Sequence, residues 1–266
     1  MVLLLTAIFF VLGLIIGSFL NVVICRINTA RTMGGRSACM TCERRLSWYE
    51  LIPLFSFAAL RGRCKSCKTK ISIQYPLVEF TTGLIFASLF LKYQDIFFTD
   101  MLAFFNIYTY YAIIFSILIV SATYDLKHKI IPDVLSLIFG LLAFLGLFLF
   151  TSLGFYPHIP SILEFLSGFL IALPFTLLWL VSGGRWMGFG DAKLALGIGW
   201  LQPLSSAFSG LAIAFWSGAI VGIFLVIWDK RRRIRNRGMK SEIPFAPFLA
   251  LGAILAFIFG LNFFGI

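Results

Sequence analysis

The sequence predicts an all-α polytopic membrane protein, because its composition leaves too little polar surface for a soluble one. Of its 266 residues, 60% are hydrophobic and only 12% are charged, and the mean hydropathy is +0.98. An ordinary soluble domain carries about 25% charged residues. The same composition excludes an intrinsically disordered chain and a small secreted protein held together by disulfides.

Long apolar runs predict about eight transmembrane helices. A helix needs about 20 mostly apolar residues to cross the hydrocarbon core. The first run lacks the basic start and cleavage site of a signal peptide, so it is expected to be a retained span. The sixth run is short and begins at glycines. The predicted spans cover roughly residues 2–25, 76–92, 100–124, 131–150, 161–181, 190–201, 205–228 and 246–264.

The basic residues predict the orientation of these spans. When the gaps are assigned alternately to the two sides, all but one of the 22 Lys and Arg residues fall on the side of residues 26–75, the exception being Lys92. Cytoplasmic loops hold such an excess, so this side is predicted to be the cytoplasm. The run from Lys230 to Lys240 is interpreted as a topology determinant that touches anionic membrane lipid. The net charge of +11 therefore does not indicate a nucleic-acid partner.

Residues 26–75 form the one stretch long enough for a folded unit outside the membrane, and four cysteines mark it. Their spacing is C-x2-C-x21-C-x2-C, one residue beyond the usual window for paired zinc knuckles. Four thiolates in two such pairs can surround Zn²⁺ as a tetrahedron with no open catalytic position. We expect a structural zinc site at Cys39, Cys42, Cys64 and Cys67, with two redox pairs or plain small hydrophobes as the alternative.

Two aspartates are predicted to lie at the cytoplasmic ends of their spans, at the same membrane depth. Asp125 closes the third span and Asp191 opens the sixth. Ionisable groups at such positions indicate function by default. Two adjacent carboxylates share a proton, so one can take a proton from water while the other polarises a peptide carbonyl. The pair is therefore a candidate acid–base dyad.

Helix dipoles and glycines refine this expectation. A helix N-terminus favours an anion and a C-terminus disfavours it, which predicts Asp125 as the more readily protonated partner. Gly188 and Gly190 precede Asp191, and we expect them to allow unusual backbone conformations and close approach of a substrate strand. The alternatives are that Asp191 is an N-cap and Asp125 an interface residue, or that both form a proton or cation relay in a transporter.

Six motifs follow one another along the chain. They are residues 17–23 (GSFLNVV), 46–53 (LSWYELIP) between the cysteine pairs, 75–79 (YPLVE), Asp125 with 131–133 (IPD), 188–193 (GFGDAK) and 243–248 (IPFAPF). In this order they resemble the motifs of the type IV prepilin peptidases, which are bifunctional leader peptidases and N-methyltransferases with a GxGD-type membrane aspartic protease.

The resemblance implies a multi-pass enzyme of the bacterial inner membrane whose active site faces the cytoplasm. Such an enzyme removes a short basic leader from prepilins and pseudopilins after a glycine. It then methylates the new N-terminus with S-adenosyl-L-methionine. The resemblance also implies that Asp125 and Asp191 are catalytic.

The resemblance further divides the chain into two functional regions. Residues 1–92, with the cysteine segment 26–75, would be the methyltransferase-associated region, and residues 93–266 the peptidase region. Gly188, Gly190, Lys193, Glu79 and Asp133 are expected to support the substrate or the backbone. Glu79 would orient the substrate amine or pair with a cation such as Arg26, and Asp133 would favour the dipole of its helix.

Two hypotheses from other classes remain at this point. A transporter would tend to show internal repeats and polar residues at the membrane midplane. We find no convincing repeat, and the acids lie at the predicted rim. The other hypothesis is a catalytically inactive, zinc-dependent assembly protein of a secretion machinery.

Overall fold

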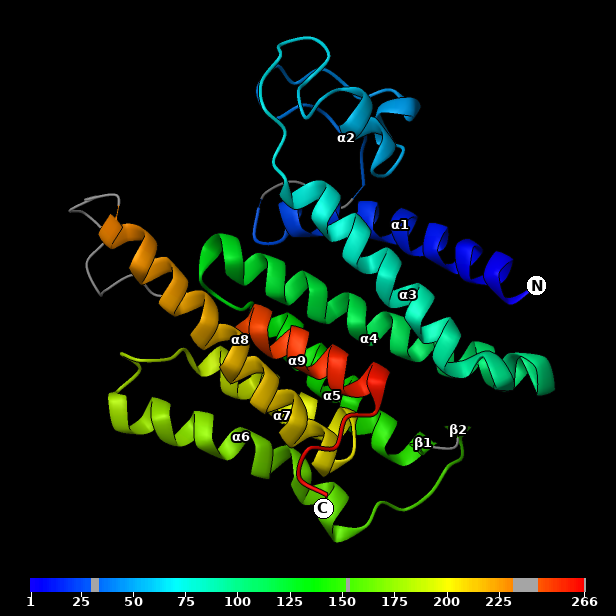
Figure 1. Ribbon diagram of the computed structural model, residues 1–266, viewed down its shortest axis with the longest axis vertical. Coiled ribbons are helices and arrows are strands. Elements are labelled where there is room, and N and C mark those ends of the chain that lie inside the picture. Colours follow the sequence, from blue (N-terminus) through cyan, green and yellow to red (C-terminus); the bar gives the residue numbers. More distant parts are fainter. Residues whose placement is uncertain (30–33, 152–153, 232–243, 266) are drawn as a thin grey trace. The chain divides into compact units, whose positions relative to one another are not determined.

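The computed structural model describes residues 1–29, 34–151, 154–231 and 244–265, and it is almost entirely helical there. Each of the eight predicted segments forms a helix (Figure 1). These helices are α1 (Val2–Arg26), α3 (Gln74–Thr99), α4 (Met101–His128), α5 (Asp133–Leu149), α6 (Ile162–Ser182), α7 (Phe189–Leu201), α8 (Leu204–Arg231) and α9 (Ala246–Phe259).

The remaining elements are short. A 3-10 helix, η1 (Trp48–Leu51), and α2 (Phe55–Ala59) lie between α1 and α3. Strands β1 (Phe150–Thr151) and β2 (Gly154–Phe155) pair antiparallel after α5. The basic residues from Arg232 to Lys240, and Ile243 of the C-terminal motif, lie outside the described residues.

Five helices are long and apolar enough to cross a membrane, namely α1, α3, α4, α6 and α8. The prediction of a multi-pass helical protein is confirmed, whereas the count of eight spans is supported only in part. Helices α5 and α9 are apolar but have 17 and 14 residues. Helix α7 has 13 residues, which gives about 20 Å of length against a hydrocarbon core of about 30 Å.

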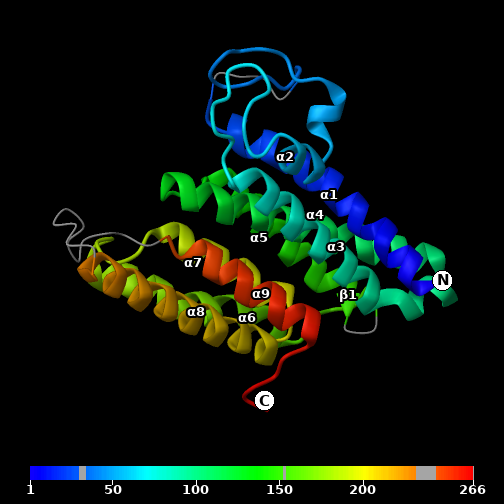
Figure 2. The same ribbon diagram turned by 45° about the horizontal axis from the view of Figure 1, so that its top comes forward.

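The chain divides into two compact units, Met1–Thr123 and Tyr124–Ile266. In the first unit, α1 and α3 lie side by side (Figures 1 and 2). Small residues allow this close approach, because a Cβ added to Gly17 would stand 2.7 Å from Cα of Glu79. Asn21 of α1 adds a polar link, since its Nδ2 donates to the carbonyl of Tyr75 at 3.0 Å.

Aromatic rings fill the other part of this unit. Phe9 of α1 stacks on Phe90 of α3, with ring centroids 4.7 Å apart, and meets Phe104 of α4 edge to face. Phe90 and Phe104 are fully buried. Aromatic pairs in these geometries stabilise packing beyond their buried area, so this cluster joins the three helices of the unit.

In the second unit α7 packs against both α5 and α6, and α9 packs against α8, as Figure 2 shows. The α6–α7 contact is tight, because a Cβ added to Gly199 would lie 2.7 Å from Cα of Gly168. Ser167 of α6 donates to the carbonyl of Gly199 at 2.7 Å. The unit thus holds α7, the helix that carries Asp191, on two sides.

Candidate active site and metal centre

The two aspartates of the predicted dyad are both buried in the second unit. Asp125 lies in the last turn of α4 and is 5% exposed, and Asp191 lies in the first turn of α7 and is 7% exposed. They stand close enough for the charge on Asp125 to act directly on Asp191. The fold therefore brings these two carboxylates together, as a shared-proton pair requires.

Hydrogen bonds distinguish the two carboxylates. Asp125 accepts a hydrogen bond from the backbone N–H of Ala246, the first residue of α9, at 3.3 Å. Oδ1 of Asp191 is buried and has no hydrogen-bond partner among the described residues. An N–H donor stabilises a carboxylate anion, and a buried oxygen without a donor does not. These contacts favour Asp191 as the protonated member, the reverse of the assignment from helix dipoles.

The two glycines before Asp191, Gly188 and Gly190, matter for the room they leave beside α7 more than for an unusual backbone conformation. Neither has a positive φ, so the expectation of unusual backbone conformations is wrong for both. Gly188 is the N-cap of α7, and the one neighbour of a Cβ there would be the backbone N of Gly190 at 4.0 Å, which is ordinary contact. At Gly190 a Cβ would lie 3.0 Å from Cβ of Ile131, so a larger residue at this position would push against Ile131.

Lys193 and Asp133 form an ion pair that joins α7 to α5. Nζ of Lys193 lies 2.6 Å from Oδ1 of Asp133, and it also lies 5.3 Å from the ring centroid of Phe189. The side chain of Asp133 is 80% exposed and lies in the first turn of α5, where its charge favours the helix dipole. Lys193 lies two residues after Asp191 on α7, about half a helical turn away.

Glu79 belongs to the first unit and is 8% exposed. Its Oε2 accepts a hydrogen bond from the backbone N–H of Leu54 at 2.9 Å, which ties α3 to the segment between α1 and α3. The guanidinium of Arg26, a partner considered from the sequence, donates to the carbonyls of Gly34 and Gly35.

The four cysteines predicted to bind metal do come together. Their Sγ atoms all lie within 4.8 Å of one another, and Sγ of Cys39 and Sγ of Cys67 are 3.8 Å apart. Four sulfurs at about 2.3 Å from one tetrahedral Zn²⁺ would be about 3.8 Å apart. The cluster therefore has the ligand type and the spacing for a metal ion.

Each cysteine pair sits in the same kind of turn. In the first turn, the backbone N–H of Glu43 donates to the carbonyl of Cys39, and the N–H of Cys39 donates to the carbonyl of Arg44. In the second turn, the N–H of Lys68 donates to the carbonyl of Cys64, and the N–H of Cys64 donates to the carbonyl of Thr69. Glu43 and Lys68 both have a positive φ. The two knuckles thus repeat each other 25 residues apart.

The thiols are predisposed to different protonation states. Hydrogen bonding with Thr69 lowers the pKa of Cys67 to about 6. Backbone hydrogen bonds from Cys42 and Thr41 lower the pKa of Cys39. A backbone hydrogen bond from Arg44 would lower the pKa of Cys42, yet desolvation and the neighbouring sulfurs raise it to about 11. A cation at the centre would relieve the repulsion that keeps the last thiol protonated.

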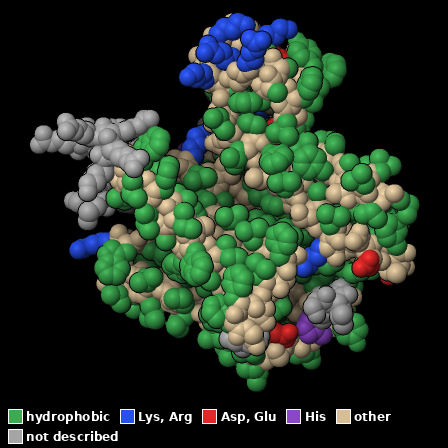
Figure 3. Space-filling model, viewed as in Figure 1, with side chains coloured by type: hydrophobic (Ala, Val, Ile, Leu, Met, Phe, Trp, Pro, Cys, Tyr) green, Lys and Arg blue, Asp and Glu red, His purple; other side chains and the backbone are tan. Residues whose placement is uncertain are grey.

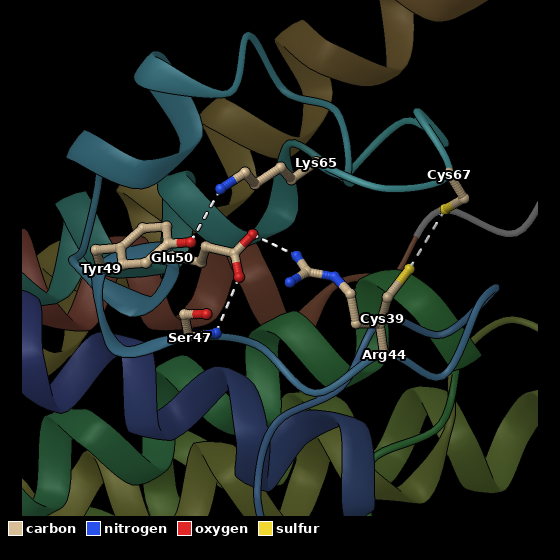
Figure 4. A network of polar contacts seen from close by, with 7 residues as sticks. All are labelled: Cys39, Arg44, Ser47, Tyr49, Glu50, Lys65 and Cys67. Carbon is tan, nitrogen blue, oxygen red and sulfur yellow. Dashed lines mark hydrogen bonds and ion pairs between the residues drawn. The ribbon is translucent and has the colours of Figure 1, made fainter.

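A polar network connects η1 to both knuckles (Figure 4). Glu50 is 7% exposed; it accepts from the guanidinium of Arg44 and from the backbone N–H of Ser47. Lys65, beside Cys64, donates to the hydroxyl of Tyr49 at 3.0 Å. Sequence reasoning missed the role of Glu50, although the S-x-x-E pattern from Ser47 to Glu50 is that of a capping box.

Comparison with known proteins supplies the family. Residues 11–93 match the model described as "Bacterial Peptidase A24 N-terminal domain", and residues 112–223 match the "Type IV leader peptidase family". A "Prepilin leader peptidase/N-methyltransferase" of Myxococcus xanthus is 34% identical over 239 residues, which cover 88% of this chain and 67% of the relative. The chain belongs to the type IV leader peptidase family. The resemblance drawn from the six motifs is thereby confirmed.

Two further relatives in this family are matched over most of their length. Proteins of the same description from Aeromonas hydrophila and Bacillus subtilis are 32% and 30% identical, with 89% and 94% of each relative covered. No solved structure matches the chain. The peptidase-family match includes Asp125 and Asp191, whereas the N-terminal match includes all four clustered cysteines and Glu79.

Proposed function

We propose that this protein is a prepilin leader peptidase and N-methyltransferase whose peptidase site is the pair Asp125 and Asp191. The single observation that carries the site assignment is that two buried carboxylates from α4 and α7 lie in one compact unit, near enough for the charge of Asp125 to act on Asp191. The relatives supply the substrate class, since each is described as a prepilin leader peptidase/N-methyltransferase.

The chemistry follows from the different surroundings of the two carboxylates. Ionised Asp125 removes a proton from water, and the resulting hydroxide attacks the carbonyl carbon of the scissile peptide. Protonated Asp191 donates a hydrogen bond to the carbonyl oxygen as negative charge develops there. Proton transfer to the leaving nitrogen completes hydrolysis without a covalent intermediate. Gly190, Gly188 and the Lys193–Asp133 pair hold the turn that carries Asp191.

The membrane arrangement suits such a substrate. We infer eight spans in a bacterial inner membrane, with the dyad and the cysteine segment on the cytoplasmic side, because this orientation collects the basic residues there. A prepilin has a basic leader followed by an apolar helix, so its scissile bond lies at the same membrane edge. The dyad is buried, so helices must part to admit the peptide, and a substrate glycine eases local unwinding.

The N-methyltransferase activity belongs to residues 1–92, and the peptidase activity belongs to residues 93–266. Cys39, Cys42, Cys64 and Cys67 would hold a structural Zn²⁺ that orders their segment. S-adenosyl-L-methionine would supply the methyl group when bound. Glu79 would support this half by fixing the turn at Leu54, because its carboxylate accepts the N–H of that residue.

Cleavage of a prepilin by the purified, reconstituted protein tests the proposal. Asp125→Ala and Asp191→Ala should each abolish leader removal, a loss of several orders of magnitude, because each removes one member of a unit that acts together. Mass spectrometry of the product reads leader removal and N-terminal methylation separately, and an unchanged melting temperature shows that each variant is folded. Leader removal by either variant would contradict the dyad and leave the pair to a relay role.

A further inference from the structure

Large apolar side chains are exposed on the segment between α1 and α3. Trp48 is 78% exposed, Phe55 is 67% exposed and Leu51 is 41% exposed. Trp48 and Leu51 are three residues apart in the 3-10 helix η1, and side chains at this spacing lie on the same side of such a helix. Clustered exposed side chains of this size indicate an interaction surface.

A strained turn attaches this surface to α3. Leu54 has φ 58° and ψ −47°, which is a γ-turn conformation, and the N–H of Phe55 donates to the carbonyl of Pro53 at 2.5 Å. The N–H of Leu54 donates to the buried carboxylate of Glu79. Such backbone strain persists only where surrounding contacts enforce it.

The attachment fixes the height of the surface along α3. Glu79 lies five residues after Gln74, the first residue of α3, which is about 8 Å along the helix axis. Helix α3 is one of the helices able to cross the membrane. Phe55 follows Leu54 directly, so it is held beside the first turns of a spanning helix, near the level where headgroups meet acyl chains.

Charge is arranged to match this placement. Figure 3 shows Lys and Arg side chains gathered on the part of the segment that points away from α1 and α3. The exposed basic residues of the described part of this segment are Arg36, Arg45, Arg61, Arg63, Lys65, Lys68 and Lys70. The apolar residues of η1 and α2 can therefore enter lipid while the cations stay in water. Trp and other aromatic residues favour this interface.

We propose that Trp48, Leu51 and Phe55 form an interfacial anchor, inserted among the phospholipids of the bilayer that α1 and α3 cross. The anchor holds the four-cysteine centre at a fixed height above the membrane, because η1 is joined to both knuckles through Glu50, Arg44 and the Tyr49–Lys65 bond. This anchor does not depend on the peptidase activity.

Fluorescence of the full chain in nanodiscs tests the anchor. The difference between the emission of wild type and that of Trp48→Phe isolates Trp48. We expect blue-shifted emission that brominated phospholipid quenches and iodide does not. Trp216→Phe gives the matched reference for lipid contact, since Trp216 is 76% exposed on the spanning helix α8. Ser66→Trp in the Trp48→Phe background gives the water-exposed reference, on the second knuckle.

Phe55→Trp in the Trp48→Phe background reports a second anchor position and should behave like Trp48. Red-shifted emission with full iodide quenching at both positions would overturn the proposal. Iodide protection that arises only after prepilin is added would also overturn it and assign the surface to substrate. Prepilin cleavage, measured in the same nanodiscs, separates a failure of the anchor from a failure of the proposed peptidase.

Discussion

The four-cysteine centre and the aspartate pair are assembled in opposite ways. The cysteine centre is built from two repeated turns within one segment, with Cys42 and Cys67 exposed. The aspartate pair joins α4 to α7, and its hydrogen bond from Ala246 spans 121 residues. One centre depends on local turns and on the proposed metal ion, whereas the other depends on the packing of distant helices.

The four-cysteine centre is also more exposed than the aspartate pair. A chelator can reach the thiols directly, because two of them lie at the surface. Asp125 and Asp191 are nearly fully buried, and in the proposed mechanism helices part to admit the peptide. The two activities should therefore be separable, because a change at one centre leaves the other intact as a control.

Removing the metal should produce the largest effect. Cys64→Ser removes the buried ligand, and structural zinc sites contribute on the order of 10 kcal/mol to the folding of such segments. We expect loss of zinc, rapid proteolysis between α1 and α3, and loss of N-methylation, with leader cleavage retained. Cys25→Ser, outside the cluster, is the control. Full zinc content in Cys64→Ser would contradict the four-ligand site.

Separating α8 from α9 should have the next largest effect, on the other centre. A Cβ added to Gly252 would stand near the backbone of Gly210, so Gly252→Ala forces the helices apart at a cost of about 1–3 kcal/mol. Because α9 supplies the Ala246 donor to Asp125, thermal stability and cleavage should both fall while zinc content stays unchanged.

Gly140→Ala is the matched control for this substitution. A Cβ there meets nothing within 4 Å, so the change should be neutral or slightly stabilising. Equal melting temperatures of the Gly252→Ala and Gly140→Ala proteins would show that the α8–α9 crossing is looser than the close approach of Gly252 to Gly210 implies.

Acid should weaken the cysteine segment in part through Glu50. The Ser47 N–H, with further help from Arg44, lowers the pKa of Glu50 from 4.5. Because the folded pKa lies below the unfolded one, Glu50 contributes stability above about pH 4.5 and loses it as the pH falls through the folded pKa. Proteolysis of the segment against pH should show a weaker acid dependence in Glu50→Gln than in wild type. An unchanged slope, or an equal change in Glu43→Gln, would remove Glu50 from the explanation.

The Lys193–Asp133 pair should give the smallest change in stability. The pair is exposed, and exposed ion pairs contribute about 0.2–1 kcal/mol. Lys193→Met should lower the melting temperature slightly, and high salt should lower it similarly in wild type. A larger fall in kcat for cleavage than in stability would assign the pair to positioning of Asp191.

The sequence by itself determined the positions of the helices, the four-cysteine cluster, the excess of basic residues in the loops on one side and the choice of the two candidate aspartates. These features depend on apolar run length, on ligand spacing and on residue type, all of which are local. The hydrogen bond between Ser47 and Glu50 could also have been predicted, since Ser47 lies three residues before Glu50 in a capping-box pattern.

Only the tertiary structure decided the contacts between distant residues. It showed that α9 donates to Asp125, that one oxygen of Asp191 has no hydrogen-bond partner within the described part of the chain, and that Glu79 accepts from Leu54. It also showed that Gly190 lies tightly against Ile131 and that its own backbone conformation does not call for a glycine. The hydrogen bond from Ala246 to Asp125 favours the opposite proton assignment from helix dipoles, because a donor on another helix, which no local pattern encodes, acts directly on the carboxylate.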